Sequence, residues 1–280
     1  MALPIVQNRQ PWRQAPMDPI SEPQFILIRW YQQGDEVACR KIIHEGVMAT
    51  VLPAFFTALT REVTFEIIII MAAFMFVFMG LSPTICLLSI PLSVLIIYLC
   101  VYLSHITRAY SVSEELMNIP KNFLSSKNTG FWVAEAFESY PQRKDPSQLK
   151  YLIINESQLQ TISGQGRYFN KKIIGTIAVN QSRQEMDSAW LRRMAVTSKY
   201  QRKGVGTALL NEALRFCQRR GYEYVIMVAS ECHEAAKKLS LKKGFELRQL
   251  YHKQFLGSLV QVLMYEFSYK IPGQEHFSFL

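Results

Sequence analysis

The chain has 280 residues, of which 49% are hydrophobic and 19% charged, and its formal net charge is +9. This composition excludes a wholly disordered protein, and five cysteines are too few for a disulfide scaffold. The charge is unevenly spread, because residues 1–104 hold six Lys+Arg against seven Asp+Glu and the whole positive excess follows them.

The first 24 residues are polar and rich in proline. We expect a disordered tail there, and no cleaved signal peptide, because no cationic start leads into an apolar run.

Residues 67–103 contain no Asp, Glu, Lys, Arg or His. About 18 such residues suffice to suggest a bilayer span, whereas buried core helices have apolar runs of roughly 10 to 14 residues. A helix-breaking cluster, residues 80–83, divides the stretch into Ile67–Met79 and Thr84–Leu103. We therefore predict a membrane hairpin over residues 63–104, either spanning a thin bilayer or entering it as a re-entrant wedge. A buried helix pair of a soluble protein is the alternative.

The flanking charges predict how this hairpin is oriented. Cations lie at both ends of the hairpin and none in its turn: Arg40, Lys41, Arg61, Arg108 and Lys121. Both ends are therefore expected to face the cytosol. N-glycosylation acceptor sequences begin at Asn155 and Asn180, and in this orientation both stay unmodified.

After the hairpin, the pattern becomes that of an α/β protein. Apolar runs predict strands at Gly130–Glu135, Lys172–Val179 and Ala189–Val196. The polar stretch 139–170 between the first two is predicted to be a surface loop. Alternation in the third strand places Arg192 and its neighbour Arg193 on opposite faces.

A basic, glycine-containing turn follows the third strand and reads Q-R-K-G-V-G at residues 201–206. It opens directly into an amphipathic helix that runs through Arg220. Unpaired backbone N–H groups and the positive helix end make such a turn an anion site. The spacing excludes a P-loop and a Rossmann turn, and a plain strand-to-helix connection is the alternative interpretation.

A strand at residues 224–228, a helix at 234–243, Gly244-Phe245 and a last strand at 260–268 follow. This order resembles the GNAT acetyltransferase superfamily, whose pyrophosphate loop Q/R-x-x-G-x-G/A is matched by Gln201, Gly204 and Gly206.

Residues 28–35 resemble the opening strand and turn of these enzymes. Together with the hairpin, they resemble the camello-like membrane-bound branch of the endoplasmic reticulum, which includes cysteine S-conjugate and aspartate N-acetyltransferases. The resemblance covers about residues 25–267 without the insert. It implies a mixed α/β GNAT domain, residues 25–62 and 105–270, interrupted by the hairpin and followed by a tail at 271–280.

The resemblance further implies acetyl-CoA as co-substrate, no metal, and a small-molecule or protein amine as acceptor. Strand backbone would bind the pantetheine arm, and loop N–H groups would hold the pyrophosphate. The implied cofactor-binding residues are Met194, Ala195, Val196, Gln201, Arg202, Lys203, Gly204, Val205, Gly206 and Thr207.

The expected general acid and base are less clearly marked. Ser240 occupies the position at which many relatives have a tyrosine that protonates the departing thiolate. His233 is a candidate proton shuttle, with a helix-start histidine as the alternative. Glu185 and Asp187 are candidate bases, with exposed loop carboxylates as the alternative.

Arg193 is the candidate residue for binding an acceptor carboxylate, because a guanidinium binds carboxylates in bidentate fashion; a structural salt bridge is the alternative. A different class of function also stays open, namely a catalytically inactive acyl-CoA-binding membrane scaffold. Nucleic-acid binding is not expected from the pI of 9.3, because coenzyme A phosphates and anionic membrane lipid account for the excess charge.

Overall fold

The computed structural model describes residues 24–139, 146, 149–156, 169–182, 185, 187–255 and 260–272. The predicted tail at 1–24 lies outside them except for its last residue, as do most of the insert and the end of the predicted tail at 271–280.

An eight-stranded mixed sheet forms the centre of the protein, in the order β3-β1-β2-β4-β5-β6-β8-β7. The strands are β1 (Phe25–Trp30), β2 (Gly130–Ser139), β3 (Leu152–Asn155), β4 (Phe169–Gln181), β5 (Ser188–Val196), β6 (Tyr224–Ser230), β7 (Glu246–Phe255) and β8 (Val260–Lys270). β1 runs parallel to β3, and β5 runs parallel to β6; the other neighbours are antiparallel.

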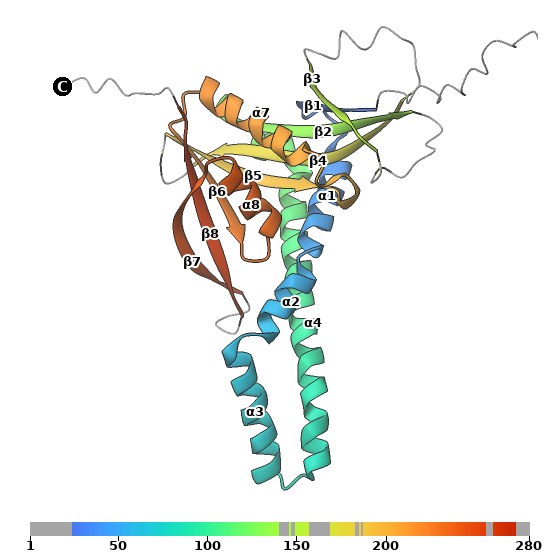
Figure 1. The fold of residues 1–280 in the computed structure, drawn as a ribbon, viewed down its shortest axis with the longest axis vertical. Helices are drawn as coiled ribbons and strands as arrows, with labels where there is room; N and C mark the ends of the chain where they lie inside the picture. The colour runs from blue at the N-terminus through green and yellow to red at the C-terminus, as the bar shows by residue number, and fades with distance from the viewer. Residues whose placement is uncertain are drawn as a thin grey trace, which may run out of the picture.

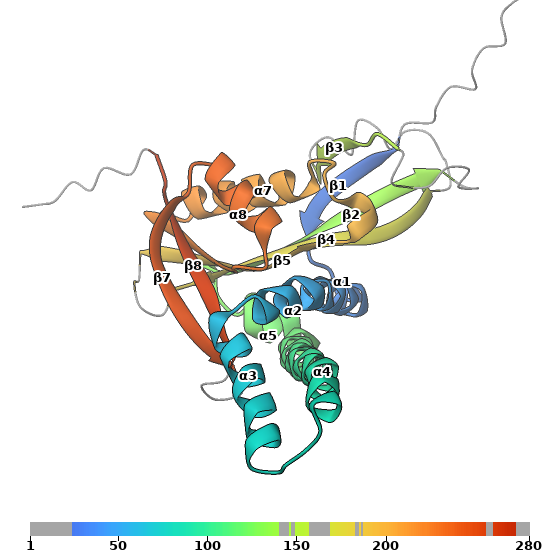
Figure 2. The ribbon, with the colours of Figure 1, turned by 60° about the horizontal axis from the view of Figure 1, so that its bottom comes forward.

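The helices are α1 (Glu36–Met48), α2 (Val51–Leu59), α3 (Glu62–Val77), α4 (Pro83–Glu115), α5 (Ile119–Phe123), α7 (Val205–Arg219) and α8 (Glu234–Lys242), with short 3-10 turns η1 (Leu116–Asn118) and η3 (Ser198–Tyr200). α7 and α8 cover one face of the sheet, while α1, α5 and the end of α4 cover the other (Figure 2).

Alternation along β2 explains why the sheet has two apolar faces. Trp132 and Ala134 belong to the core cluster beneath α7, whereas Phe131 and Val133 belong to the cluster that packs with α1 and α4. All four are at most 1% exposed. Successive side chains of a strand point to opposite faces, so a sheet covered on both sides needs continuous apolar residues.

The predicted hairpin is present, and α3 and the first part of α4 extend well away from the sheet (Figure 1). Two helical stretches are long and apolar enough to cross a bilayer, Glu36–Leu59 and Pro83–Phe123. Only 17% and 11% of their most apolar windows are buried, whereas the core helix of a soluble protein is mostly buried. The 16 residues of α3 extend about 24 Å, which is short for an ordinary bilayer.

α4 continues without interruption from the hairpin turn into the folded domain, although Pro91 lies inside it. Its last part contributes Val112 to the core cluster under the sheet, where Leu116 of η1 follows it. One helix therefore connects the apolar hairpin to the centre of the folded domain.

Most predicted elements of the second half are confirmed by β2, β4, β5, β6, α7, α8 and β8. The prediction that residues 139–170 form only a surface loop is wrong. Within this segment, β3 pairs with β1, with Phe25 opposite Leu152 and Ile28 opposite Asn155. Four residues with weak alternation are too short a run to be recognised as a strand from the sequence.

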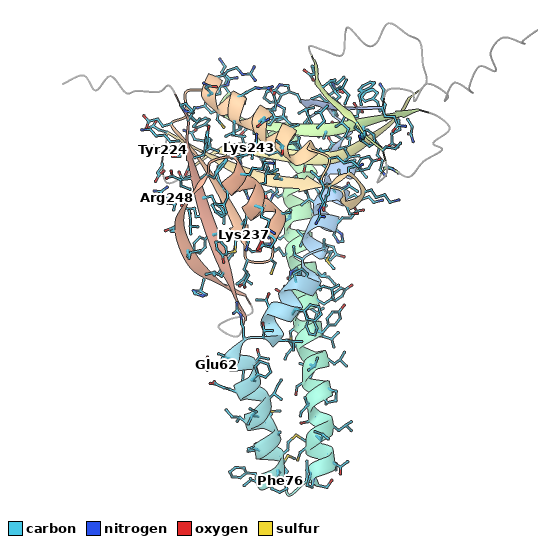
Figure 3. All side chains as sticks on the ribbon, in the orientation of Figure 1. Glu62, Phe76, Tyr224, Lys237, Lys243 and Arg248 are labelled. Carbon is cyan, nitrogen blue, oxygen red and sulfur yellow. The ribbon has the colours of Figure 1, made fainter. Side chains whose placement is uncertain are left out.

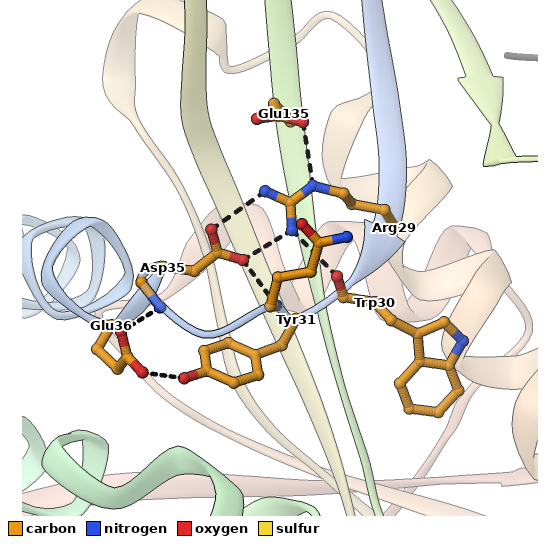
Figure 4. A network of polar contacts seen from close by, with 8 residues as sticks. Arg29, Trp30, Tyr31, Asp35, Glu36 and Glu135 are labelled. Carbon is orange, nitrogen blue, oxygen red and sulfur yellow. Dashed lines mark hydrogen bonds and ion pairs between the residues drawn. The ribbon is translucent and has the colours of Figure 1, made fainter.

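A buried polar network fixes the first strand to its neighbours (Figure 4). The Arg29 guanidinium donates to both carboxylate oxygens of Asp35, at 2.7 and 3.1 Å, and to Glu135 at 3.0 Å. Asp35 also accepts a hydrogen bond from the backbone N–H of Gln32 at 2.9 Å. The network joins β1, the turn before α1, and β2, so it holds the segment before the hairpin against the segment after it.

Candidate active site

The parallel strands β5 and β6 part halfway along their length. Their ladder pairs Ser188–Leu191 with Tyr224–Met227 and goes no further. In the described ladders, Met194 and Val196 have no partner in β6, while β6 pairs with β8 along its whole length on its other edge. The carboxyl ends of the two strands therefore open toward the same edge of the sheet, the edge at which α/β proteins commonly bind ligands.

A β-bulge shapes β5 at this point. Thr176 of β4 lies opposite Ala195 and Ala178 lies opposite Arg192, so β5 has one more residue than its partner. Arg193 has φ 53°, a conformation uncommon for residues other than glycine, and its carbonyl accepts a hydrogen bond from the Thr176 hydroxyl at 2.8 Å.

The bulge overturns the prediction that Arg192 and Arg193 point to opposite faces. Both guanidiniums reach the Glu115 carboxylate at the end of α4, Arg192 at 3.0 Å and Arg193 in a short contact. Arg192 also lies 4.7 Å from the ring centre of Trp190. A bulged residue interrupts the alternation of side chains between the two faces of a strand. For this reason the prediction from alternation was wrong for these two arginines. The Nε of Arg193 is buried and has no hydrogen-bond partner among the described residues.

The glycine-containing turn has the geometry expected of an anion-binding loop. Arg202 and Gly204 have φ 59° and 85°, and α7 begins directly after them at Val205. The first N–H groups of a helix have no intrahelical acceptor, so the amides of the first turn of α7 are available to an anion. Gly206 packs closely against β5, because a Cβ there would lie 3.3 Å from the Met194 Cε.

The remaining loop residues surround this helix start. The Gln201 side chain donates to the Val196 carbonyl at 2.9 Å, which holds the loop against the end of β5. The Lys203 ammonium donates to the Leu149 carbonyl, and Thr207 is half-buried in the first turn of α7. The structure thus brings together all ten predicted cofactor-binding residues.

His233 lies directly before α8, at the end of β6. Its Nδ1 is 2.5 Å from the Ser230 hydroxyl. Burial, together with the nearby cations Arg108 and Lys237, lowers the pKa of His233 to about 4. The imidazole is therefore neutral at pH 7, the form that accepts a proton.

Ser240 is placed differently. It is fully buried in α8, and its hydroxyl donates to the Ala236 carbonyl at 2.9 Å and contacts the Met227 sulfur at 3.7 Å. The hydroxyl proton is thus engaged inside the helix.

Glu185 and Asp187 precede β5 and so lie at the end opposite the loop, about 26 Å along a nine-residue strand. Glu185 pairs with Arg248, which lowers its pKa and makes it a weaker base. Figure 3 shows Arg248 and Tyr224 together, away from Lys237 of α8. The structure therefore does not bring these two carboxylates to the open end of β5.

Sequence reasoning missed two contributions from α4 and from the link between α2 and α3. Arg61, between α2 and α3, forms a 3.0 Å ion pair with Glu231 beside His233. Arg108 of α4 is close enough to Arg193 and His233 for their charges to interact. The cations were noted only as topology signals, because their proximity to the end of β6 depends on how the hairpin packs.

Comparison with known proteins agrees with this geometry. The model of the acetyltransferase (GNAT) family matches residues 124–245. N-acetyltransferase 8B of Rattus norvegicus is 24% identical over 57% of this chain and 58% of its own length. The probable N-acetyltransferase camello of Xenopus tropicalis is 24% identical over 84% of this chain and 91% of its own. N-acetylaspartate synthetase of Danio rerio is 24% identical over 86% of this chain and 76% of its own.

The matched segment contains the parted strands, the bulge and the loop before α7, and the similarity to the camello relative extends over 84% of the chain. Residues 124–245 are therefore similar to the GNAT family of acetyltransferases, and a relative named as a probable N-acetyltransferase is similar over 84% of the chain.

Proposed function

We propose that this protein is an acetyl-CoA-dependent N-acetyltransferase that modifies a primary amine at the endoplasmic reticulum membrane, with its acetyltransferase domain in the cytosol. The observation that carries the proposal is the positive-φ loop at the start of α7, placed where β5 and β6 part.

The residues at this position fit coenzyme A. The amides at the start of α7 suit a pyrophosphate, and the strand backbone at Met194 to Val196, unpaired with β6, suits the amides of a pantetheine arm. Acetyl-CoA supplies an activated thioester, and the chain's part is to hold the thioester and the amine together.

His233 is the best placed of the four candidate acid–base residues. It lies at the same sheet edge as the loop, because β5 and β6 are parallel. Its position supports this role, whereas its lowered pKa makes the imidazole a weaker base than an ordinary histidine. Ser240 is the remaining candidate for protonating the thiolate. Glu185 and Asp187 lie at the other end of β5, so a proton would have to cross the length of the strand to reach them.

The acceptor is a free amino acid, a cysteine conjugate or a protein lysine. Arg193 supports a carboxylated acceptor, because its Nε is buried without a partner in the described residues. A carboxylate bound there would compete with Glu115, which already holds the other side of the guanidinium.

The proposed location rests on three features. These are the apolar stretches Glu36–Leu59 and Pro83–Phe123, the cations that flank the hairpin, and the similarity to camello-like proteins.

The test uses the intact chain in detergent, with acetyl-CoA and a panel of amines, and detects both released coenzyme A and acetylated product by mass spectrometry. We expect product with at least one acceptor class. Coenzyme A binding without turnover would instead indicate the inactive scaffold, and no binding at millimolar coenzyme A would refute the proposal.

A loop variant with a matched control sharpens the test. Gly204→Ala introduces a side chain at φ 85° and is expected to weaken coenzyme A binding about tenfold or more. Gly34→Ala introduces comparable backbone strain at φ 105° before α1, and it should leave binding unchanged. Equal binding by both variants would remove the loop from the cofactor site.

A further inference from the structure

The insert before β4 contacts the loop before α7. Five consecutive residues of the insert, 149–153, lie beside residues 200–204, and we call residues 149–153 the brace. Tyr151 and Ile153 pack against the same core cluster as Tyr200 and Val205. The sequence assigned no role to this segment.

The first connection passes through one buried carboxylate. The hydroxyls of Tyr151 and Tyr200 both donate to Oε1 of Glu138, at 2.6 and 2.8 Å, and their rings are 5.8 Å apart. Glu138 is only 2% exposed, so losing either donor leaves a buried carboxylate poorly satisfied. Burial and Glu138 together raise the pKa of Tyr151, which stays a hydrogen-bond donor at neutral pH.

The second connection is made by Lys203 of the loop itself. Its ammonium donates to the Leu149 carbonyl at 2.5 Å and lies 5.5 Å from the centre of the Tyr151 ring. The third is a close approach, because a Cβ on Gly204 would lie 3.4 Å from the Ile153 Cδ1. The brace therefore contacts the loop on both sides of Arg202, which has positive φ.

These contacts restrain the backbone of the loop at Arg202. Backbone in the left-handed region costs about 1 kcal/mol or more for a residue other than glycine, so it persists only where its surroundings hold it. Arg202 has φ 59° and is itself exposed, so its neighbours must supply the restraint. A loop held in its binding conformation loses less entropy when a ligand binds.

We propose that the brace preorganises the coenzyme A loop, and that Tyr151 and Lys203 are positioning residues that set the affinity for acetyl-CoA without taking part in the chemical step. This inference rests on the proposed function and adds to it a role for the insert. It assigns Lys203 mainly to the brace, and not to a direct phosphate contact.

The test measures coenzyme A binding by calorimetry and steady-state kinetics on the full chain. Tyr151→Phe removes the hydroxyl and keeps the ring, and Lys203→Met removes the ammonium. Each is expected to raise the Kd for coenzyme A and the KM for acetyl-CoA about fivefold while kcat stays within about twofold. Lys203→Arg keeps the cation over the ring and should restore most of the affinity.

Lys150→Met is the matched control, because Lys150 is an exposed lysine of the same segment and its loss changes net charge equally. It should bind coenzyme A like the parent chain. In the double variant Y151F/K203M, the loss should be smaller than the product of the two single losses, since both act through one brace.

The outcomes separate this inference from the proposed function. A parent chain that binds no coenzyme A overturns both. A parent chain that binds, together with unchanged Kd in Tyr151→Phe and Lys203→Met, overturns the brace alone. Fully multiplicative losses, or an equal loss in Lys150→Met, would show that Lys203 acts by its charge on the phosphates.

Discussion

At the scale of single residues, charged groups from several elements gather around the end of β6. His233 is held neutral by burial and by cations that come from other elements, Arg108 of α4 and Lys237 of α8. Arg193 is aimed at Glu115 by a bulge. The identities of these side chains are visible in the sequence, but their neighbours are set by tertiary packing.

His233 should make stability depend on pH. Its folded pKa is about 4 against an ordinary value of 6.5, so between these pH values the unfolded chain binds a proton that the folded chain does not. Stability should therefore fall as pH falls from 6.5 to 4, by up to about 1.4 kcal/mol per pH unit from this group. In His233→Gln this part of the slope should vanish in denaturation curves collected across that range.

The exposed histidine His252 of β7 provides the control for this measurement. His252→Gln is expected to keep the parent slope. A His233→Gln variant with the parent slope would show that this imidazole is not held neutral in the folded protein.

Arg193 and Arg192 can be separated by kinetics, since both pair with Glu115 but only Arg193 has an unsatisfied buried Nε. Arg193→Ala should raise KM for a carboxylated amine about tenfold or more and leave KM for acetyl-CoA nearly unchanged. The same amine without its carboxylate should be unaffected.

Arg192→Ala removes the same charge from the same carboxylate and should have a clearly smaller effect. Similar increases in KM for acceptor and acetyl-CoA would assign Arg193 to a structural salt bridge instead.

At the scale of elements, the sequence predicts well where periodicity is strong. The strands β2, β4 and β6, the helix α7 and the hairpin all follow from apolar patterns. The strand β7 was missed because most of its residues are polar and its ladder with β8 contains a bulge at Leu247 to Gln249. α1 and α2 were missed because the same stretch was noted only for its opening turn and its cations.

Only part of the candidate site could be predicted from the sequence. The loop before α7 depends on local glycine spacing, so its position was correct. The brace, the bulge at Arg193 and the pair Arg61–Glu231 depend on which elements lie side by side, and no local pattern encodes that. The missed contacts join residues that are far apart in the chain.

The network that joins β1, α1 and β2 should contribute strongly to stability. Arg29 is 7% exposed, and Arg29→Met would leave Asp35 and Glu135 as buried carboxylates without their cation. We expect a loss of about 3 to 5 kcal/mol in the free energy of unfolding, measured by chemical denaturation in detergent.

A surface ion pair serves as the comparison. Glu212 pairs with Arg215 and Arg219 along α7, and both arginines are more than half exposed. Glu212→Gln should cost less than about 1 kcal/mol. A loss this small in Arg29→Met as well would mean that the buried network adds little net stability.

At the scale of the whole molecule, the proposed topology makes a prediction about glycosylation. Asn180 is a poor reporter of orientation, because its Oδ1 is buried and its Nδ2 donates to the Asn122 carbonyl at 3.4 Å. An unmodified Asn180 is thus expected in either orientation.

Limited proteolysis of sealed microsomes gives a clearer answer. With both ends of the hairpin in the cytosol, protease added outside should remove an epitope tag at the C-terminus without detergent. Protection of that tag until detergent is added would reverse the topology, and a luminal marker protein should be protected throughout.

The position of β1 between β3 and β2 has a consequence for biosynthesis. Trp30 leaves the ribosome long before its partner Trp132, and the entire apolar hairpin is translated in the interval. The nascent first strand must therefore stay unpaired until the whole hairpin has been made, and only then can the remaining strands close around it. Synthesis of the hairpin thus precedes closure of the sheet around β1.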